Sequence, residues 1–283
     1  DVGLHATVSQ CVKFYGCFHV YSLFFYDFLR EKCGISDVFQ AFYEEDVDRD
    51  TDVLFSVGGD GTFLDSAMRV KNYGIPVLGI NSGRLGFLAN IAQEEIPQAI
   101  HWLCAGEFDV EQRALVKFEM EDNPFAEFNY ALNEISILKT ERSSLLKVHA
   151  YIGEEYLTTY WADGVIVATP TGSTAYSLSC GGPIVAFGCD NLIITPVSPH
   201  NLNMRPLILP GNVQIRLKVE SRSGDFMLSA DSRMQRMSDN HELFISSGDF
   251  KMNVVKMPDH SYYETLRNKL NWGEDKRNKK DKS

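Results

Sequence analysis

The stretch Val53-Leu54-Phe55-Ser56-Val57-Gly58-Gly59-Asp60-Gly61-Thr62 decides the fold of this 283-residue chain. An apolar run of strand length leads into a glycine-rich turn, and residues 63–68 then carry apolar side chains at helical spacing. Glycines let the backbone take φ values closed to other residues and approach a ligand, while a helix start adds partial positive charge, so the turn is typical of a phosphate-binding loop. Asp60 is unusual there, because a carboxylate repels phosphates unless a metal ion neutralises it or it receives a proton.

The same turn also fits an ordinary strand-to-helix connection in which Asp60 caps the helix and the glycines relieve strain, and both interpretations stay open. A second apolar run follows at residues 75–80, so residues 52–81 predict a strand–helix–strand unit of a parallel sheet. The carboxyl ends of both strands then meet at one edge of the sheet. We therefore expect residues 58–62 and 81–87 to face one crevice, where open α/β sheets bind ligands.

Composition and charge exclude several classes of protein. A hydrophobic content of 44% with 23% charged residues is ordinary for a globular protein of up to two domains. The net charge of −11 argues against nucleic acid or an anionic membrane as the main partner, since both attract basic surfaces. The six cysteines show no paired metal-ligand spacing, which predicts reduced thiols, and no apolar run is long enough to span a membrane. With no recognisable signal peptide, we expect a cytoplasmic protein.

The chain changes character after residue 108, where apolar residues begin to alternate with polar ones. Residues 212–220 alternate without a break, as in a half-buried strand. Further short β segments are predicted at 114–120, 130–138, 147–152, 165–169, 191–195, 227–230, 243–246 and 252–256. We therefore expect an α/β domain over residues 1–107, ending with a helix at 94–104 that Gly106 stops, and a β-rich domain over residues 108–257. Residues 258–283 are expected to hold a helix at 261–270 and a polar tail.

Two further segments carry polar groups suited to a ligand. Residues 162–183 hold Asp163 and the run Thr169-Pro170-Thr171-Gly172-Ser173-Thr174-Ala175-Tyr176-Ser177-Leu178-Ser179, whose hydroxyls and glycines offer hydrogen bonds and room for a flat ring. A helix capped by Ser173 or Thr174 explains this run equally well. In Asn133-Glu134, the carboxylate suits ribose hydroxyls and the amide suits a base edge, although an exposed strand end is the simpler explanation.

Together these segments resemble the NAD kinase family, which transfers a phosphoryl group to the 2′-hydroxyl of the adenosine ribose of NAD. Their order and spacing match from about residue 53 to residue 210, and residues 79–87, Pro199-His200 and Arg205-Pro206 add to the match. The resemblance implies a Rossmann-like parallel-sheet domain, an all-β domain of two sheets, and a last helix that returns to the first domain. It also implies NAD as substrate, Mg²⁺ with ATP or in some members polyphosphate as donor, and a homo-oligomer, either dimer or tetramer.

The resemblance further assigns roles to residues, and it assigns no side chain as a metal ligand. Asp60 would be the general base, in a phosphate loop formed by Gly58, Gly59, Gly61 and Thr62, with Phe87 as a nearby wall. The dinucleotide would also contact Gly61 and the residues Asn133, Glu134, Asp163, Thr174, Ala175, Tyr176, Ser177, Leu178, Ser179 and Arg233. Trp161 replaces a basic residue of many relatives, so stacking or packing is expected there in place of a salt bridge.

Two alternatives to this function stay open. A lipid kinase of the diacylglycerol or sphingosine type has the same glycine loop but needs an apolar channel. A non-catalytic NAD(P)-binding sensor would bind the dinucleotide without turning it over. The N-terminal strand–helix unit is also short, since His19 to Leu29 resembles the second strand and following turn of the family.

Overall fold

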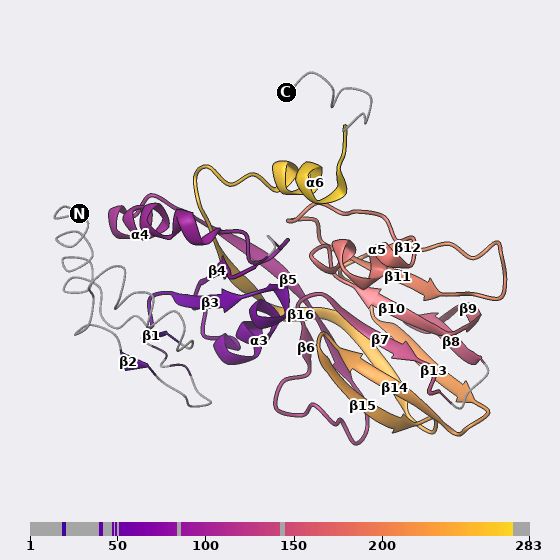
Figure 1. Cartoon of the computed structure of the whole chain (residues 1–283). Coiled ribbons are helices and arrows are strands. Elements are labelled where there is room, and N and C mark those ends of the chain that lie inside the picture. The colour runs from indigo at the N-terminus through magenta and orange to yellow at the C-terminus, as the bar shows by residue number, and fades with distance from the viewer. Residues whose placement is uncertain are drawn as a thin grey trace. The chain divides into compact units, whose positions relative to one another are not determined.

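The computed structural model describes residues 19–20, 40–41, 47, 49, 51–83, 86–141 and 145–273 (Figure 1). The chain divides into two compact units. Unit 1 takes its residues from Asp1–Phe63, Pro76–Glu111 and Val254–Ser283, and unit 2 takes them from Leu64–Ile75 and Gln112–Asn253. The domain boundaries expected at residues 107 and 257 stay a prediction. Among the described residues, no helix has the length and apolar content that crossing a membrane requires.

Unit 1 is built on a parallel sheet in the order β2-β1-β3-β4. Its strands are β1 (His19–Val20), β2 (Gln40–Ala41), β3 (Leu54–Gly58) and β4 (Val77–Asn81). Helix α3 (Asp60–Val70) follows β3, which confirms the strand–helix–strand unit predicted from residues 52–81. Most of the segment from His19 to Leu29, like the tail after residue 273, lies outside the described residues.

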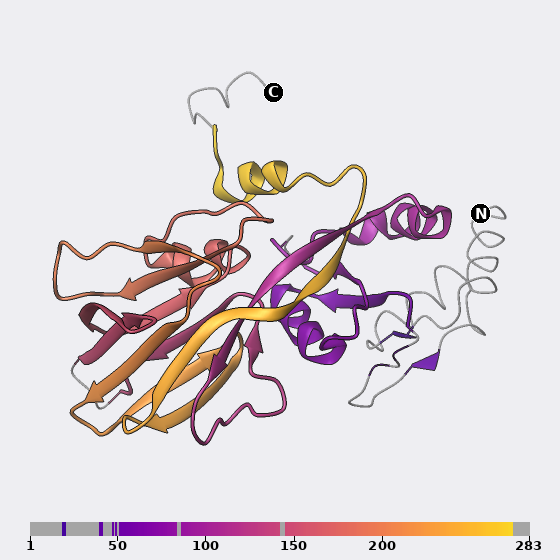
Figure 2. The ribbon, with the colours of Figure 1, turned by 180° about the vertical axis from the view of Figure 1, so that it is seen from behind.

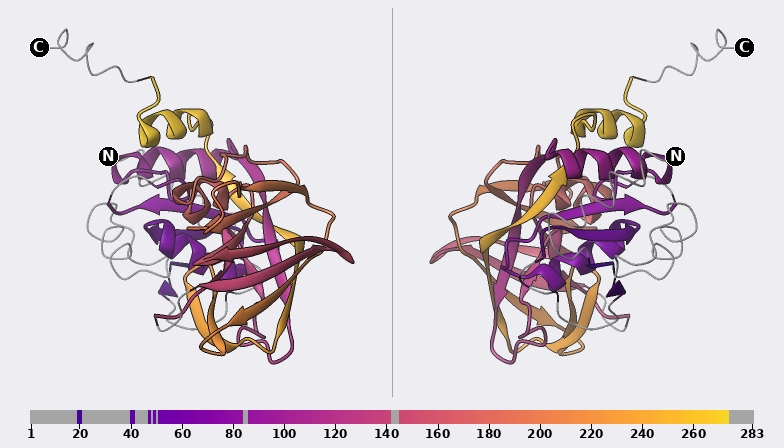
Figure 3. Two further views of the ribbon diagram at one scale, coloured as in Figure 1. Left: turned by 90° about the vertical axis from the view of Figure 1, so that its right-hand side faces the viewer. Right: turned by 90° about the vertical axis from the view of Figure 1, so that its left-hand side faces the viewer.

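The core of unit 1 lies between the sheet and helix α4 (Ile96–Ala105), which follows the short helix η1 (Gln93–Glu95). Ile96 and Ala99 of α4 pack on Phe55 and Leu78 of the strands. Gly106 ends α4 with a left-handed φ of 72°, as predicted. The last helix, α6 (Tyr262–Leu270), belongs to unit 1 and lies on the same side of β3 and β4 as α4 (Figures 1 and 3). This placement confirms the expected return of the chain to its first domain.

Unit 2 consists of two antiparallel sheets with an apolar core made from both. The first sheet contains β5 (Asp109–Glu119), β6 (Tyr130–Ala131), β8 (Leu146–Ile152), β9 (Glu155–Ala162), β13 (Ile215–Ser221) and β16 (Glu242–Lys256). The second has the order β12 (Leu207–Pro210), β11 (Asn191–Val197), β10 (Gly164–Ala168), β7 (Glu134–Leu138), β14 (Asp225–Ala230) and β15 (Arg233–Ser238). The expected fold class, α/β followed by an all-β domain of two sheets, is confirmed.

The strand predictions differ from the structure in two ways. The segments predicted at 243–246 and 252–256 are one continuous strand, β16, which Figure 2 shows curving along its length. Strands β9, β12 and β15 were not predicted, and each is the last strand at an edge of its sheet. Strand β15 carries polar residues such as Gln235 and Arg236 and lacks the alternation that identifies a half-buried strand, whereas β12 is apolar and only four residues long.

A short helical layer covers the outer face of the second sheet of unit 2. It comprises η2 (Gly172–Thr174) and α5 (Tyr176–Ser179). Val185 and Cys180 after them pack on Ile166 and Ile193 of the strands. Neither helix has a side-chain cap, so the caps expected from Ser173 and Thr174 were wrong. Ser173 instead donates its hydroxyl to the Pro170 carbonyl and accepts the Val185 N–H, which fixes the loop internally.

The cysteines depart in part from the sequence expectation. Cys104 is disulfide-bonded, which corrects the prediction of reduced thiols for that residue. Cys180 and Cys189 are free, and burial raises the pKa of the Cys180 thiol.

Candidate active site

The glycine loop of unit 1 has ordinary backbone angles. Neither Gly58, Gly59 nor Gly61 has a positive φ, so the expectation that these glycines supply unusual φ values was wrong. These glycines matter because of the space that a side chain would occupy. A Cβ at Gly58 would lie 2.3 Å from Thr62 Oγ1, whereas a Cβ at Gly59 or Gly61 would meet no atom within 4 Å. Gly59 and Gly61 thus leave open space beside the first turn of α3, the end of a helix that attracts anions.

The Asp60 carboxylate holds the loop that follows β4. Its Oδ2 accepts the N–H of Phe87 at 2.9 Å, and its Oδ1 accepts those of Leu88 and Ala89, each at 3.0 Å. A carboxylate has about four acceptor positions, so these bonds leave one, on Oδ2. The helix-cap alternative did not predict this role. The expected proximity of residues 58–62 and 81–87 is confirmed by these bonds and by Ser82 N–H donating to the Gly58 carbonyl at 3.2 Å.

Gly86 and Phe87 complete this part of unit 1. A Cβ at Gly86 would lie 1.8 Å from Asp60 Oδ1, so the loop packs directly on the carboxylate. Phe87 is half-buried, with Lys269 Nζ of α6 6.0 Å from its ring centroid, and its role as a wall of the site stays a prediction. Arg84 and Leu85 of the predicted motif lie outside the described residues.

In unit 2, the Asn133-Glu134 corner lies directly beside the hydroxyl-rich loop. Thr169 connects them, because its Oγ1 donates to the Leu132 carbonyl at 2.6 Å and its N–H donates to the Asn133 carbonyl at 2.9 Å. A Cβ at Gly172 would lie 2.0 Å from the Asn133 carbonyl oxygen, so only glycine allows this approach. The structure therefore brings together two segments that lie more than thirty residues apart in sequence.

Glu134 carries the clearest sign of a ligand site in unit 2. Its Oε2 is buried and has no hydrogen-bond partner among the described residues. Burial, and secondarily the charge of Asp231, raise the pKa of Glu134 to about 8. A carboxyl group in this state is neutral near pH 7 and offers one O–H donor as well as acceptors. An unsatisfied buried polar atom is costly, so a ligand that bonds Oε2 gains by relieving it.

The remaining predicted pocket residues of unit 2 lie at Asp163 and on the hydroxyl-rich loop. Burial raises the pKa of the Tyr176 phenol, and the charges of Cys180, Asp163 and Glu134 raise it further, which places these groups near one another. Asp163 Oδ1 pairs with Lys139 Nζ at 2.7 Å. Ser177 is buried, and its Oγ lies 2.8 Å from Thr195 Oγ1. Thr174, Ala175, Leu178 and Ser179 lie on η2, on α5 or between them.

Comparison with known proteins fits both units. The model of the ATP-NAD kinase N-terminal domain matches residues 30–108, and that of the ATP-NAD kinase C-terminal domain matches residues 132–257. A NAD kinase of Cytophaga hutchinsonii is 47% identical over 80% of this chain and 78% of its own length. One from Flavobacterium psychrophilum is 44% identical over 88% and 86%.

The chain belongs to the NAD kinase family. Solved structures agree with this. A yeast NADH kinase complexed with NADH superposes with a TM-score of 0.72 at 27% identity, covering 80% of this chain and 68% of that one. A NAD kinase from Archaeoglobus fulgidus in complex with ATP has a TM-score of 0.72 at 24% identity over 90% and 98%, and shares the fold.

Arg233 and Trp161 both have local contacts in this member of the NAD kinase family. The Arg233 guanidinium donates to the Phe128 and Tyr130 carbonyls and lies over the Phe125 ring, so its proposed ligand contact competes with these partners. Trp161 is 49% exposed, and Lys147 Nζ lies 4.8 Å from its ring centroid, which fits the packing role expected of it.

Sequence analysis gave no role to one residue of this region, Asp231. Its carboxylate accepts the N–H groups of Leu132, Asn133 and Glu134, and it has a positive φ of 52°. The signal in the sequence is a residue type that tolerates this backbone conformation, placed directly after the strand predicted at 227–230.

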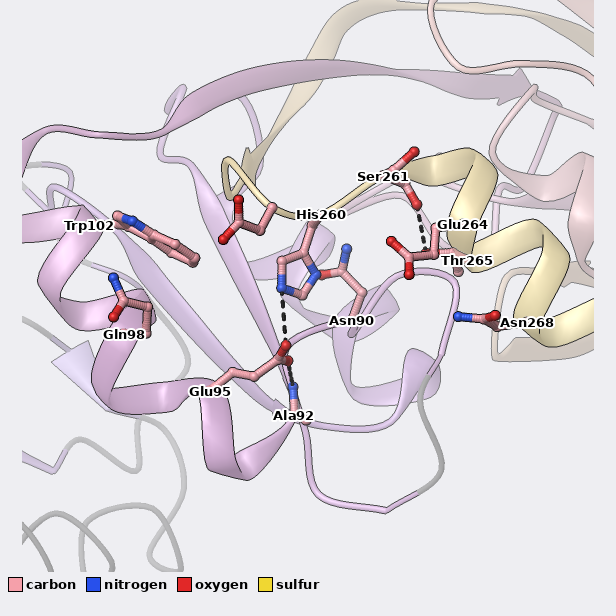
Figure 4. Close-up of a pocket in the computed structure, with 11 residues that line it drawn as sticks. Asn90, Ala92, Glu95, Gln98, Trp102, His260, Ser261, Glu264, Thr265 and Asn268 are labelled. Carbon is pink, nitrogen blue, oxygen red and sulfur yellow. Dashed lines mark hydrogen bonds and ion pairs between the residues drawn. The ribbon is translucent and has the colours of Figure 1, made fainter. Parts of the chain in front are cut away.

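A separate cavity of about 470 Å³ in unit 1 does not suit the phosphates of a nucleotide (Figure 4). Its lining includes the carboxylates of Glu95, Asp259 and Glu264 but no lysine or arginine. Figure 4 shows His260 directed toward Glu95, with His260 Nε2 3.5 Å from Glu95 Oε1. Since like charges repel, the loop at Asp60, with its open helix N-terminus, is the better candidate for phosphate binding in this NAD kinase relative.

Proposed function

We propose that this protein phosphorylates the 2′-hydroxyl of the adenosine ribose of NAD to give NADP, with ATP as the phosphoryl donor. The observation that carries the proposal is the match of both ATP-NAD kinase domain models in a chain where Asp60 keeps one open acceptor position. Relatives that are 42–47% identical bear the name NAD kinase, and they align over most of their length.

Asp60 Oδ2 is the atom we assign to the proton. A sugar hydroxyl is a poor nucleophile, and a positioned carboxylate that takes its proton in the transition state contributes roughly 10²- to 10⁴-fold to the rate. The three amide bonds fix the direction of the remaining acceptor position, which a general base requires. The glycine loop and the start of α3, where Gly61 lies and the helix dipole is positive, are assigned to the donor phosphates.

Mg²⁺ fits this site as an ion that arrives with the nucleotide. Among the described residues, no three His, Cys, Asp or Glu side chains form a metal-binding group. Magnesium usually keeps several waters and binds one or two carboxylates together with substrate phosphates, so no protein cage is needed. When bound, it would neutralise phosphate charge. The single open position on Asp60 serves either a proton or a metal ion, and we assign it to the proton.

Unit 2 is assigned to the dinucleotide. The unpartnered Oε2 of Glu134 and the Asn133 side chain would bind the adenosine part. Asp163, Tyr176, Ser177 and their neighbours on η2 and α5 would form the surrounding wall. Neutral Glu134 and the surrounding hydroxyls suit a sugar and a base, which offer donors and acceptors without charge. A cytoplasmic location and a homodimer or homotetramer complete the proposal.

One assay separates this function from its alternatives. Purified protein is incubated with NAD, Mg²⁺ and either ATP, GTP or polyphosphate, and NADP formation is followed. Parallel reactions replace NAD by diacylglycerol or sphingosine. We expect NADP with ATP, no phosphorylated lipid, and loss of NADP formation in Asp60→Asn. NAD binding without any NADP would favour the non-catalytic sensor, and lipid phosphorylation would favour a lipid kinase.

A further inference from the structure

The turn between β14 and β15 presents two opposite charges to one short segment of backbone. We propose that Asp231 and Arg233 form a clamp that positions the Asn133-Glu134 corner, and that both are positioning residues for NAD. The inference rests on the proposed function, which assigns the corner to the adenosine part of the dinucleotide.

Asp231 supplies the acidic side of the clamp. Its Oδ2 accepts the Leu132 N–H at 2.8 Å, and its Oδ1 accepts the N–H groups of Asn133 at 2.8 Å and Glu134 at 3.2 Å. Three consecutive amides directed at one carboxylate define the course of the backbone through the corner. The Asp231 N–H donates in return to the Glu134 carbonyl at 3.0 Å, which closes the contact in both directions.

Arg233 supplies the basic side. Its two terminal nitrogens donate to the carbonyls of Phe128 and Tyr130, just before the corner. The planar guanidinium also lies over the Phe125 and Phe128 rings, 5.2 and 5.5 Å from their centroids. A lysine keeps the charge but not the fixed fork, so it cannot bond two carbonyls in this geometry.

The clamp also sets the charge state of the corner. Because Asp231 lies next to Glu134, its negative charge adds to burial in raising the pKa of Glu134. Loss of the Asp231 charge therefore lowers the pKa of Glu134 as well as freeing the three amides. A shift in the pKa of Glu134 can therefore be measured, and a purely structural anchor would not produce it.

The same hairpin offers a matched control. At its far end, Asp225 of β14 pairs with Arg236 of β15 and accepts the hydroxyls of Ser223 and Thr140. Asp225→Asn thus removes an Asp–Arg pair from the same two strands without changing a bond to residues 128–134. We expect its affinity for NAD to equal that of the wild type.

The experiment compares Asp231→Asn, Arg233→Lys and Asp225→Asn with the wild type. NAD affinity is measured by calorimetry from about pH 6 to about pH 9, and KM is measured for NAD and for ATP. A lost hydrogen bond to a charged group weakens binding about tenfold or more, so Asp231→Asn and Arg233→Lys should raise Kd and KM for NAD by that factor. KM for ATP should stay within about twofold. The Glu134 titration in the affinity profile should move to lower pH in Asp231→Asn.

Hydrogen exchange tests the clamp without any ligand. We expect the amides of residues 132–134 to lose protection in Asp231→Asn and keep it in Asp225→Asn. A wild type that binds NAD but forms no NADP would refute the proposed function while leaving the clamp intact. If Asp231→Asn keeps the wild-type protection of these amides and the wild-type affinity for NAD, the clamp is overturned, even if NADP is formed normally.

Discussion

Asp60 and Glu134 show how two carboxyl groups acquire different properties from their surroundings. Asp60 accepts three amide hydrogens and keeps one acceptor position. Glu134 has a buried oxygen with no partner among the described residues, and its pKa is raised to about 8. In the proposed function, Asp60 uses its remaining position to receive a proton, and Glu134 holds the ligand without adding charge.

Substitution of Asp60 by Asn should remove most turnover and keep much of the NAD affinity. The side-chain nitrogen of Asn can accept neither a proton nor the hydrogen bonds that the loop amides donate. We therefore expect kcat to fall by about 100-fold or more. Steady-state kinetics and calorimetry measure the two effects. Glu94→Gln, at an exposed position of η1, is the control. Turnover above about a tenth of the wild-type rate would rule out Asp60 as the base.

The stability of the protein should depend on pH through Glu134. Its folded pKa of about 8 lies above the ordinary value of 4.5, so its contribution is fully present below about pH 4.5 and is lost as the pH rises through about 8. The free energy of unfolding of the wild type should therefore fall from about pH 5 to about pH 8.5 more than that of Glu134→Gln. Urea titrations measure this difference. Glu154→Gln, at a side chain that is fully exposed, is the control, and parallel curves for wild type and Glu134→Gln would contradict the assignment.

The loop after β4 is an element whose shape depends on a missing side chain. Gly86 has no Cβ to collide with Asp60 Oδ1, and the amides of Phe87, Leu88 and Ala89 can then converge on the carboxylate. Hydrogen bonds thus hold the loop that follows β4 against Asp60, the first residue of α3.

Gly86→Ala should therefore displace either the loop or the Asp60 side chain. The added methyl group would lie 1.8 Å from Oδ1, so we expect both kcat and the melting temperature to fall. Gly83→Ala, in the same loop, is a close control, because its Cβ would meet no atom within 4 Å. Equal kinetics and melting temperatures for the two variants would show that the loop can move away from Asp60 without affecting activity or stability.

Across the whole molecule, sequence patterns predicted the helices and strands whose formation depends on neighbouring residues. The β3–α3–β4 unit, the end of α4 at Gly106 and the inner strands follow from apolar spacing and glycine placement. Strand β15 was missed because a solvent-facing strand needs no alternation, and β12 was missed because four residues are too few to show a pattern. The bonds of Asp60 to residues 87–89 and of Asp231 to residues 132–134 were not predictable, because they join side chains to amides 27 to 99 positions away. A local sequence pattern carries no information about contacts between residues so far apart in the chain.

Removal of divalent metal should abolish activity without unfolding the protein. Among the described residues no three His, Cys, Asp or Glu side chains are placed to hold a metal ion, so we expect the fold to be stable without one. With EDTA and no nucleotide, we expect a melting temperature unchanged within about 1 °C and no NADP formation until Mg²⁺ is restored. A clear fall in melting temperature with EDTA alone would indicate a structural metal that this account lacks.

Strand β16 carries the chain from unit 2 back to unit 1, and this has a consequence for synthesis on the ribosome. Val254 pairs with Val77 of β4, and Val255 and Met257 belong to the core of unit 1. Segments of unit 1 lie on both sides of the main segment of unit 2 along the chain, so unit 1 cannot be completed until Val254–Ser283 has emerged. Unit 2, whose segments all precede residue 254, can finish first, so the nascent chain would complete its units in the reverse of the order in which they begin.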